Sequence, residues 1–213
     1  VMYLKLRHKV YKLQVILLSC LILYSCNTTQ LKPDESAQLS PKNGVLVASV
    51  VIGEEQGNIL TKKGLTATFN IRRIDRGYGK DNILSIHSHP VINLGLTRKN
   101  ELKENSADGR VVVIALPPDQ YEILSWVLEV GLDYKKIYFK NFSRQLFLIN
   151  EKEITYLGEL KLEPVYGEKD LFGPVESGAQ SKCTDMYERD INIFKKKYNA
   201  LNDWAISSQL INC

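Results

Sequence analysis

The stretch GVLVASVVIG, residues 44–53, sets the expectation for the fold. It is an unbroken apolar run of strand length, rich in valine. Runs of the same kind, separated by turn residues, recur as far as about residue 164 and are rich in Val, Ile, Thr, Tyr and Phe. This pattern over about 120 residues predicts a mainly β domain, an antiparallel β-sandwich at 44–164. The predicted strands are 44–53, 65–74, 82–89, 110–116, 120–126, 135–140, 144–149 and 153–162.

The chain beyond the sandwich follows a different pattern. Residues 165–182 are rich in Gly, Pro, Ser and charged residues, which predicts a linker or a long strap. Asp185 followed by Glu188 has the spacing of a helix capping box, and the lysines at 195–197 suit the C-terminal end of a helix. Apolar residues then recur at spacings of four and three, which predicts a C-terminal α-helix docked on the sandwich. This stripe consists of Tyr187, Ile191, Phe194, Tyr198 and Leu201.

The N-terminal residues have the features of an export signal. VMYLKLRHKVYKLQ carries four basic residues and no acid, and QVILLSCLILYSC follows as a short apolar run. That run is shorter than the roughly 20 residues of a membrane-spanning helix, so residues 1–25 are interpreted as a cleaved signal peptide. An uncleaved signal anchor is the alternative.

The end of this segment, Leu23-Tyr24-Ser25-Cys26, resembles the lipobox of bacterial lipoproteins. The resemblance implies that Cys26 is acylated, with palmitate among its chains, after cleavage just before it. Tyr24 departs from the small residue usual there, and Cys20 is a second candidate for acylation. Residues 26–43 are then expected to be the acylated cysteine and a flexible tether. In enteric bacteria, an aspartate directly after the acylated cysteine retains a lipoprotein at the inner membrane. Asn27 stands at that position here, which favours the outer membrane.

Charge argues against nucleic acid as a partner. The chain has 28 Lys and Arg against 24 Asp and Glu, and four of the basic residues lie in residues 1–26. The remainder therefore balances at 24 against 24, without the excess of positive charge that binding to phosphates requires.

Two cysteines, Cys183 and Cys213, remain after residue 26. In an oxidising envelope compartment they are most simply a disulfide that closes the helix and tail at 183–213, with two free thiols as the alternative.

Two further stretches carry a family resemblance. VVVIALPPDQYEI (111–123) resembles the LPPGxYxL turn of transthyretin-like and carboxypeptidase-regulatory-like β-sandwich domains, with Asp119 where glycine is usual. FSRQLFLINEKEITYLGELKL (142–162), with its Y-L-G-E motif, resembles the closing hairpin of a group of uncharacterised bacterial lipoproteins. The resemblance implies an Ig-like or transthyretin-like sandwich in an accessory, adhesive or assembly module. It transfers no catalytic residue.

The motif HSHP at 87–90 supports a competing hypothesis. It is similar to the core of JAMM metalloproteases, in which two histidines and a downstream aspartate bind zinc. His87, His89 and Asp108 would be the ligands here, with Glu54 or Glu55 as the base and Ser106 at the oxyanion. Ser106 and Asp108 are too close together and too far downstream for that family's pattern.

Strand periodicity also favours a structural role for these histidines. His87 and His89 share a strand face with Ser85 and Ile83, which predicts an outward polar face without a metal.

We therefore expect a lipid-anchored envelope protein of the periplasm or outer membrane. It would act as a binding, scaffolding or structural module without catalytic activity or a cofactor. Sheet edges or the loops 54–64, 75–81 and 90–109 are the expected contact surfaces, and a protein of the envelope is the expected kind of partner.

Overall fold

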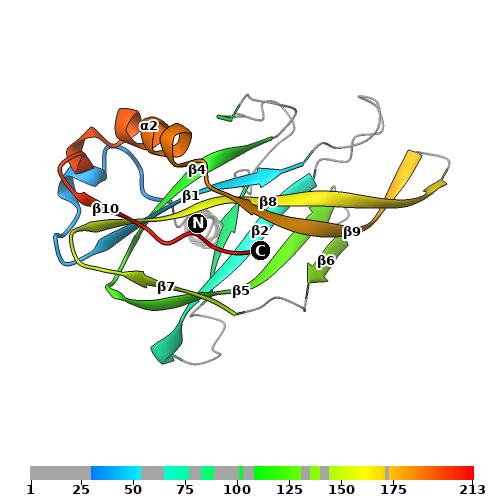
Figure 1. Ribbon diagram of the computed structural model, residues 1–213, viewed down its shortest axis with the longest axis horizontal. Helices are drawn as coiled ribbons and strands as arrows, with labels where there is room; N and C mark the ends of the chain where they lie inside the picture. The colour runs from blue at the N-terminus through cyan, green and yellow to red at the C-terminus, as the bar shows by residue number, and fades with distance from the viewer. Residues whose placement is uncertain are drawn as a thin grey trace, which may run out of the picture.

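Two β-sheets pack face to face in the computed structural model, and one helix covers the outer side of one of them (Figure 1). The prediction of a mainly β sandwich with a C-terminal helix is confirmed. The structure describes residues 30–53, 65–76, 83–88, 101–102, 108–130, 135–139, 144–170 and 173–213. The strands are β1 (Gly44–Ile52), β2 (Leu65–Arg73), β3 (Ile83–His87), β4 (Asp108–Leu116), β5 (Asp119–Val130), β6 (Lys135–Phe139), β7 (Gln145–Ile149), β8 (Glu153–Asp170), β9 (Gly173–Thr184) and β10 (Ala205–Ser208). The helices are α2 (Tyr187–Lys197) and the short 3₁₀ turns η1 (Ser36–Gln38), η2 (Ile74–Arg76) and η4 (Asn199–Leu201).

The first sheet has the strand order β10-β8-β1-β4, and β9 also pairs with β8. Its central strand β1 runs antiparallel to β4 but parallel to β8, and β10 is also parallel to β8. The antiparallel sandwich expected from the sequence thus contains two parallel strand pairs in this sheet. A long stretch of chain separates β1 from β8, and connections of that length permit parallel pairing.

The second sheet has the order β3-β2-β5-β6, with β7 also on β5, and every pair in it is antiparallel. In both sheets one long strand carries two shorter strands end to end along one edge. On β8 these are β10 and β9, and on β5 they are β7 and β6.

Strand β1 is buried along its whole length. Leu46, Ala48 and Val50 belong to the core between the sheets, whereas Val45 and Val47 belong to a second core on the other face of the first sheet. A strand with apolar neighbours on both faces needs an unbroken apolar sequence rather than an alternating one. This explains the run GVLVASVVIG.

Helix α2 provides the cover for that second core. Ile191 and Phe194 of α2 are buried against β1 and β4, and so are Tyr198 and Leu201, which follow the end of the helix at Lys197. Docking on the sandwich is therefore confirmed for these four residues, although the helix is shorter than the predicted stripe. Tyr187 is the exception and is exposed.

The expected capping box is not formed. Met186 occupies the N-cap position and makes no capping bond with its side chain. Asp185 lies one residue earlier, where its Oδ1 accepts a hydrogen bond of 2.9 Å from the backbone N–H of Tyr187.

The expectation of a flexible tether is wrong from Gln30 onward. Leu31 is buried in the second core, its backbone N–H donates to the carbonyl of Val113 over 2.7 Å, and its own carbonyl accepts from the Tyr198 hydroxyl over 2.8 Å. The side chain of Gln30 accepts a hydrogen bond of 2.6 Å from Arg110. One apolar side chain and three hydrogen bonds therefore hold this polar segment against the edge strand β4.

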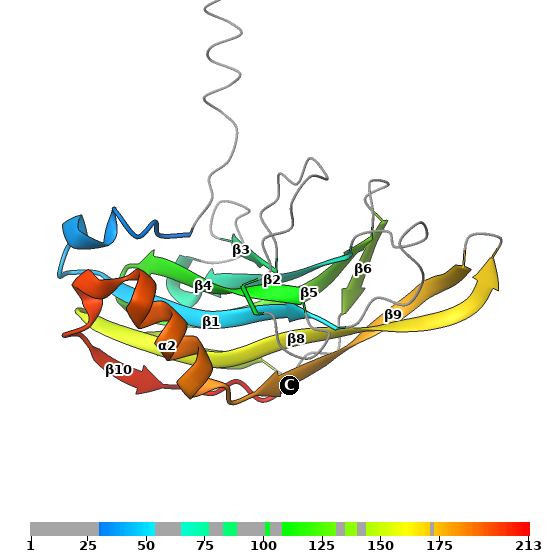
Figure 2. The same cartoon turned by 90° about the horizontal axis from the view of Figure 1, so that it is seen from above.

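The expectation of a linker at 165–182 is also wrong. These residues belong to β8 and β9, which form a long antiparallel hairpin. Its far end projects beyond the rest of the sandwich (Figure 2). Backbone pairing with a neighbouring strand offsets the low strand propensity of glycine and proline there. No helix among the described residues is long and apolar enough to cross a membrane.

The C-terminal tail closes one side of the sandwich. Beyond β10 it continues along β8, with the N–H groups of Gln209 and Ile211 donating to the carbonyls of Tyr156 and Leu157. Ile211 is buried in the core between the sheets. Cys213 forms a disulfide with Cys183 of β9, as predicted, with 5.3 Å between the two Cα atoms.

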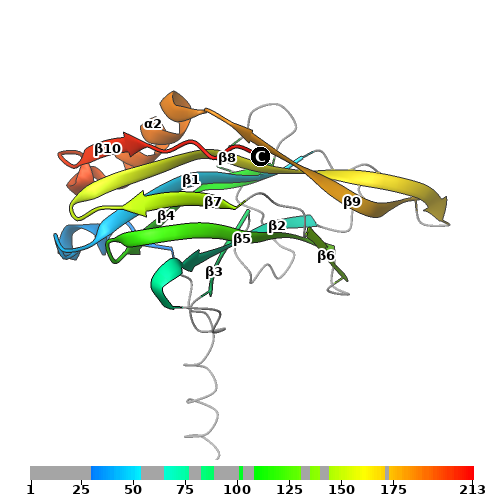
Figure 3. The same cartoon turned by 60° about the horizontal axis from the view of Figure 1, so that its bottom comes forward.

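Strand β7 lies beside β8 on this same side of the molecule (Figure 3). The side-chain amide of Gln209 makes two hydrogen bonds to the free edge of β7, accepting from the N–H of Leu148 over 2.8 Å and donating to its carbonyl over 3.0 Å. The tail therefore joins the edges of both sheets.

We expect the Cys183→Ser/Cys213→Ser variant to lose about 3–4 kcal/mol in free energy of unfolding, because the crosslink closes a long loop in the unfolded chain. Urea unfolding followed by tryptophan fluorescence measures this loss. Reducing the wild-type protein should cause the same loss and should leave the double variant unaffected. Equal stability of the two proteins under oxidising conditions would contradict the prediction.

Candidate functional site

A ladder of polar side chains crosses the outer face of the second sheet, where the sequence places His87. Thr68 Oγ1 lies 2.8 Å from His87 Nδ1, and the Ser85 hydroxyl donates to the side-chain carbonyl of Asn70 over 2.6 Å. Asn70 in turn donates to Ser125 over 3.0 Å. The bonded residues are direct cross-strand partners on β3, β2 and β5, so the ladder follows from the strand register.

A charged cluster continues the ladder along the same face. Glu122 accepts hydrogen bonds from both Arg72 and Arg144, one to each carboxylate oxygen. Arg72 and Glu122 are buried, whereas Arg144 is mostly exposed. Burial alone would raise the pKa of Glu122, but the hydrogen bonds from Arg144 and Arg72 outweigh burial and lower the pKa below its ordinary value.

The pKa of Glu122 is lower in the folded than in the unfolded protein. At pH values above the pKa of the unfolded chain, the ionised carboxylate therefore stabilises the fold. This stability should disappear as the pH falls from about 4.5 through the folded pKa. We expect Glu122→Gln to be less stable at pH 7 by about 3 kcal/mol, because it leaves a buried arginine without its counterion. Urea unfolding curves measured between pH 3 and 7 should show that the free energy of unfolding falls less with acidification in the variant than in the wild type. Parallel curves for the two proteins would contradict this assignment.

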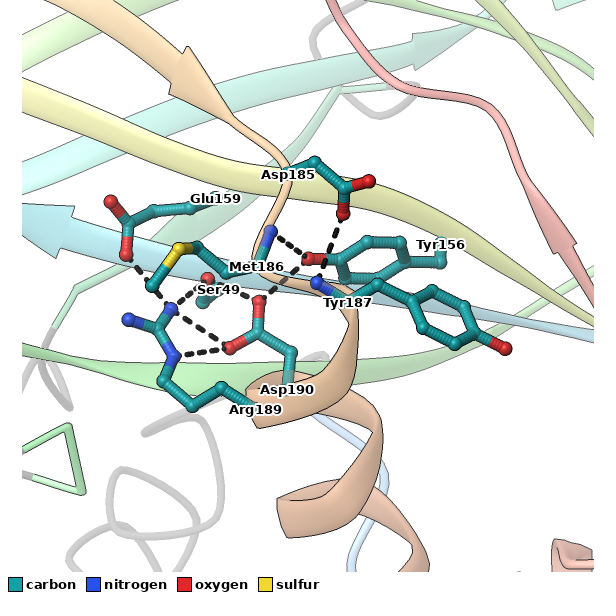
Figure 4. Close-up of polar contacts among 8 residues, drawn as sticks. All are labelled: Ser49, Tyr156, Glu159, Asp185, Met186, Tyr187, Arg189 and Asp190. Atoms are coloured by element: carbon teal, nitrogen blue, oxygen red, sulfur yellow. Dashed lines mark hydrogen bonds and ion pairs between the residues drawn. The ribbon is translucent and has the colours of Figure 1, made fainter.

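A second polar network joins α2 to the first sheet (Figure 4). Its centre is Asp190, which is fully buried. Asp190 Oδ2 accepts hydrogen bonds from Ser49 over 2.6 Å and from the Tyr156 hydroxyl over 2.9 Å, and Oδ1 accepts one from Arg189 over 2.9 Å. Both carboxylate oxygens are therefore bonded to the protein.

The remaining members of this network are also paired with one another. Arg189 donates to Glu159 over 2.8 Å and to the Ser49 oxygen over 3.0 Å, and the backbone N–H of Met186 donates to the Tyr156 oxygen over 3.1 Å. Burial and the Asp190 carboxylate together raise the pKa of Tyr156, so this phenol stays protonated and donates. The network is a clamp between helix and sheet, because its central carboxylate has no surface open to a substrate.

The Y-L-G-E motif explains how β8 supplies two side chains to this clamp. Between Tyr156 and Glu159 the register with β1 shifts by one residue, which is a β-bulge. Gly158 has φ of +96° there, and a Cβ atom on it would lie 3.0 Å from the carbonyl oxygen of Thr184. The bulge lets Tyr156 and Glu159 both face the helix, whereas regular alternation would turn Glu159 toward the core.

We expect Asp190→Ala to lower the free energy of unfolding by about 3 kcal/mol, because it removes the common acceptor of a buried hydrogen-bonded network. Asp185→Ala is the matched control, since it removes an exposed carboxylate at the start of the same helix and should cost about 1 kcal/mol or less. Urea unfolding at pH 7 compares the two. Similar small losses in both variants would refute a central role of Asp190.

A hydrogen bond between two of its own residues stabilises the LPPDQY turn, residues 116–121. The Tyr121 hydroxyl donates to the carbonyl of Pro117 over 2.9 Å, and burial raises the pKa of this phenol. Asp119, which departs from the glycine of the resembling domains, accepts a hydrogen bond of 2.6 Å from Arg73 Nε. The departure therefore adds an ion pair that ties the turn to the end of β2.

Two ligands of the zinc hypothesis, His87 and Asp108, lie among the described residues, and Arg110, on the same strand as Asp108, donates from Nε to the carbonyl of His87 over 2.9 Å. His87 ends β3 in the second sheet, and Asp108 begins β4 in the first sheet, opposite Ile52. Within the part of the chain that the structure describes, no three His, Cys, Asp or Glu side chains gather as metal ligands would. The other residues of that hypothesis, His89, Glu54, Glu55 and Ser106, lie outside the described residues, as do Cys20 and Cys26.

The loops expected to be contact surfaces are described only in small part. Residues 54–64 lie outside the description, and within 75–81 and 90–109 the structure describes 75–76, 101–102 and 108–109. The composition of residues 165–182 predicted a linker or strap, not a projecting hairpin that could serve as a contact surface. Val165 and Tyr166, two strand-forming residues among Gly, Pro and charged neighbours, were the available signal.

Two edges of this hairpin have no neighbouring strand among the described residues. Strand β1 follows β8 as far as Leu162, which pairs with Ile52, and β8 continues to Asp170 with β9 on its other edge. In the described part of the chain, no strand pairs with β8 beyond Leu162 on the β1 side, nor with the outer edge of β9. Val165, in the middle of the projecting part, is 38% exposed.

No protein-family model and no curated protein matches the sequence. Among solved structures, the chain is similar to a leucine-rich repeat protein from Bacteroides thetaiotaomicron, with 10% sequence identity and a TM-score of 0.27. The similarity covers 57% of this chain and only 14% of that protein. A likeness at this level says nothing about function.

Proposed function

We propose that this chain is a lipid-anchored binding module of a bacterial cell envelope. In this proposal Cys26 holds the protein at a membrane, the outer membrane in preference to the inner, and the β8–β9 hairpin contacts a protein partner. The observation that carries the binding role is the hairpin itself, an extended element that projects beyond both cores and whose outer edges pair with no other strand among the described residues.

The two polar clusters support a binding role over a catalytic one. Asp190 and Glu122, the buried carboxylates at their centres, are each hydrogen-bonded through both oxygens to residues of the same cluster. Such groups stabilise a fold, whereas a catalytic acid or base must reach a substrate. The Cys183–Cys213 disulfide agrees with an oxidising compartment outside the cytosol.

Strand addition is the mode of binding that best suits the hairpin. An extended segment of another envelope protein would pair, through backbone hydrogen bonds, with the edge of β8 beyond Leu162 that no described strand covers. Pro164 and the charged Glu163 and Glu168 lie along this stretch, and such residues protect exposed edges from indiscriminate pairing. The partner strand would therefore leave one of its carbonyls without a donor opposite Pro164, and it would not be strongly acidic, because Glu163 and Glu168 would repel it.

A photo-reactive amino acid in place of Val165 tests the hairpin. In intact cells we expect irradiation to give one discrete adduct between this variant and a partner protein. Replacement of Asn192, on the exposed face of α2, is the control and should give no such adduct. Adducts of the same size from both positions, or none from Val165, would contradict the assignment.

Growth with radiolabelled palmitate tests the anchor. Since the thiol of Cys26 is the proposed point of attachment, Cys26→Ser should lose the label and Cys20→Ser should keep it. Full labelling of the Cys26→Ser protein would contradict the assignment of the acylated residue.

A further inference from the structure

The packed N-terminal segment limits how far the domain can lie from its proposed anchor. Gln30 and Leu31 are held on the domain by hydrogen bonds to Arg110, Val113 and Tyr198. Only four residue steps separate Gln30 from Cys26, and four steps span at most about 14 Å of extended chain. The tether expected from the sequence, with about 17 residues, would have reached roughly 60 Å. An acylated Cys26 therefore keeps the surface around Gln30 close to the bilayer.

The C-terminal end of α2 adjoins this surface. Tyr198 follows the last helical residue and donates its hydroxyl to Leu31. Lys197 forms an ion pair of 2.7 Å with Glu101, whose backbone N–H donates to Gly109, next to the arginine that holds Gln30. Figure 2 shows the blue N-terminal segment and its turn η1 beside the end of the helix, and η1 contacts η4 there.

Two of the three lysines at this end of the helix have no ion-pair partner among the described residues. Lys195 and Lys196 are exposed, and neither makes an ion pair within the described part of the chain. By contrast, Lys32 and Lys197, the lysines nearest the N-terminal segment, are paired with Glu35 and Glu101. The helix dipole favours lysines at a C-terminal end, but it does not require them to be free of partners.

We propose that Lys195, Lys196 and Lys197, the basic end of α2, contact the anionic headgroups of the bilayer in which Cys26 is anchored. The inference rests on the proposed acylation of Cys26, which brings this surface within reach of lipid. Opposite charge then selects the orientation, because each lysine near an anionic membrane surface adds a favourable contribution. The domain would lie with this end on the membrane instead of turning freely around its anchor.

The test uses the full acylated chain, purified and placed in two kinds of vesicle: phosphatidylcholine alone, and phosphatidylcholine with phosphatidylglycerol. An amine-reactive reagent is added, and mass spectrometry gives the modification rate of each lysine. We expect Lys195 and Lys196 to react about fivefold more slowly on the anionic vesicles. Lys182, which is exposed on β9 before the helix begins, should react equally on both.

Two variants with the same loss of charge separate this contact from a general effect of net charge. In Lys195→Gln/Lys196→Gln, the remaining Lys197 should lose most of its protection on anionic vesicles. In Lys161→Gln/Lys182→Gln, which removes two lysines paired across β8 and β9, the protection at 195–197 should persist. Equal reactivity of Lys195 and Lys196 on both vesicles would overturn the inference.

The mass of the purified chain distinguishes the two ways of failing. A chain that carries acyl groups at Cys26 but shows no protection refutes the membrane contact and leaves the proposed anchor intact. A chain without acyl groups refutes the anchor, and the membrane contact with it.

Discussion

The architecture depends on strand β1, which is apolar on both faces. A strand of this kind in water would expose two rows of branched side chains, so it is stable only when both faces are covered. The second sheet covers one face, and α2 with the segment around Leu31 covers the other. The C-terminal helix and the N-terminal segment are thus parts of the domain core, although they lie at opposite ends of the sequence.

Polar residues then determine how the helix sits on the sheet. Apolar packing alone would allow α2 to slide or rotate on β1, whereas Asp190 must meet Ser49, Tyr156 and Arg189 at fixed distances. The bulge at Gly158 is part of this arrangement, because it brings Glu159 to the same face as Tyr156. The network around Asp190 fixes α2 on the sheet, and with it the lysines at 195–197 that are proposed to contact the membrane.

Closure of the sandwich depends on the tail. Ile211 fills the core between the sheets, Gln209 satisfies the edge of β7, and the disulfide at Cys213 holds the chain end on β9. On the opposite side, the N-terminal segment bonds to β4. Both ends of the described chain therefore cover strand edges of the body, whereas no described strand covers the outer edges of the β8–β9 hairpin, and the proposed binding role of the hairpin rests on this contrast.

The sequence by itself determined the strands between residues 44 and 162 and the buried residues of the helix, because the spacing of apolar residues within each segment reports which faces are buried. It also identified the cysteine pair, and the strand phase of His87 agreed with its place on the polar face of the second sheet. Only the tertiary structure decided the parallel pairing of β1 with β8, the packing of Gln30 and Leu31, and the strands at 165–182. Each of these depends on backbone bonds or single side-chain contacts between residues far apart in the chain, which leave no local pattern. Asp190 was missed for the same reason: a buried carboxylate in a helix differs from an exposed one only by the partners that the fold brings to it.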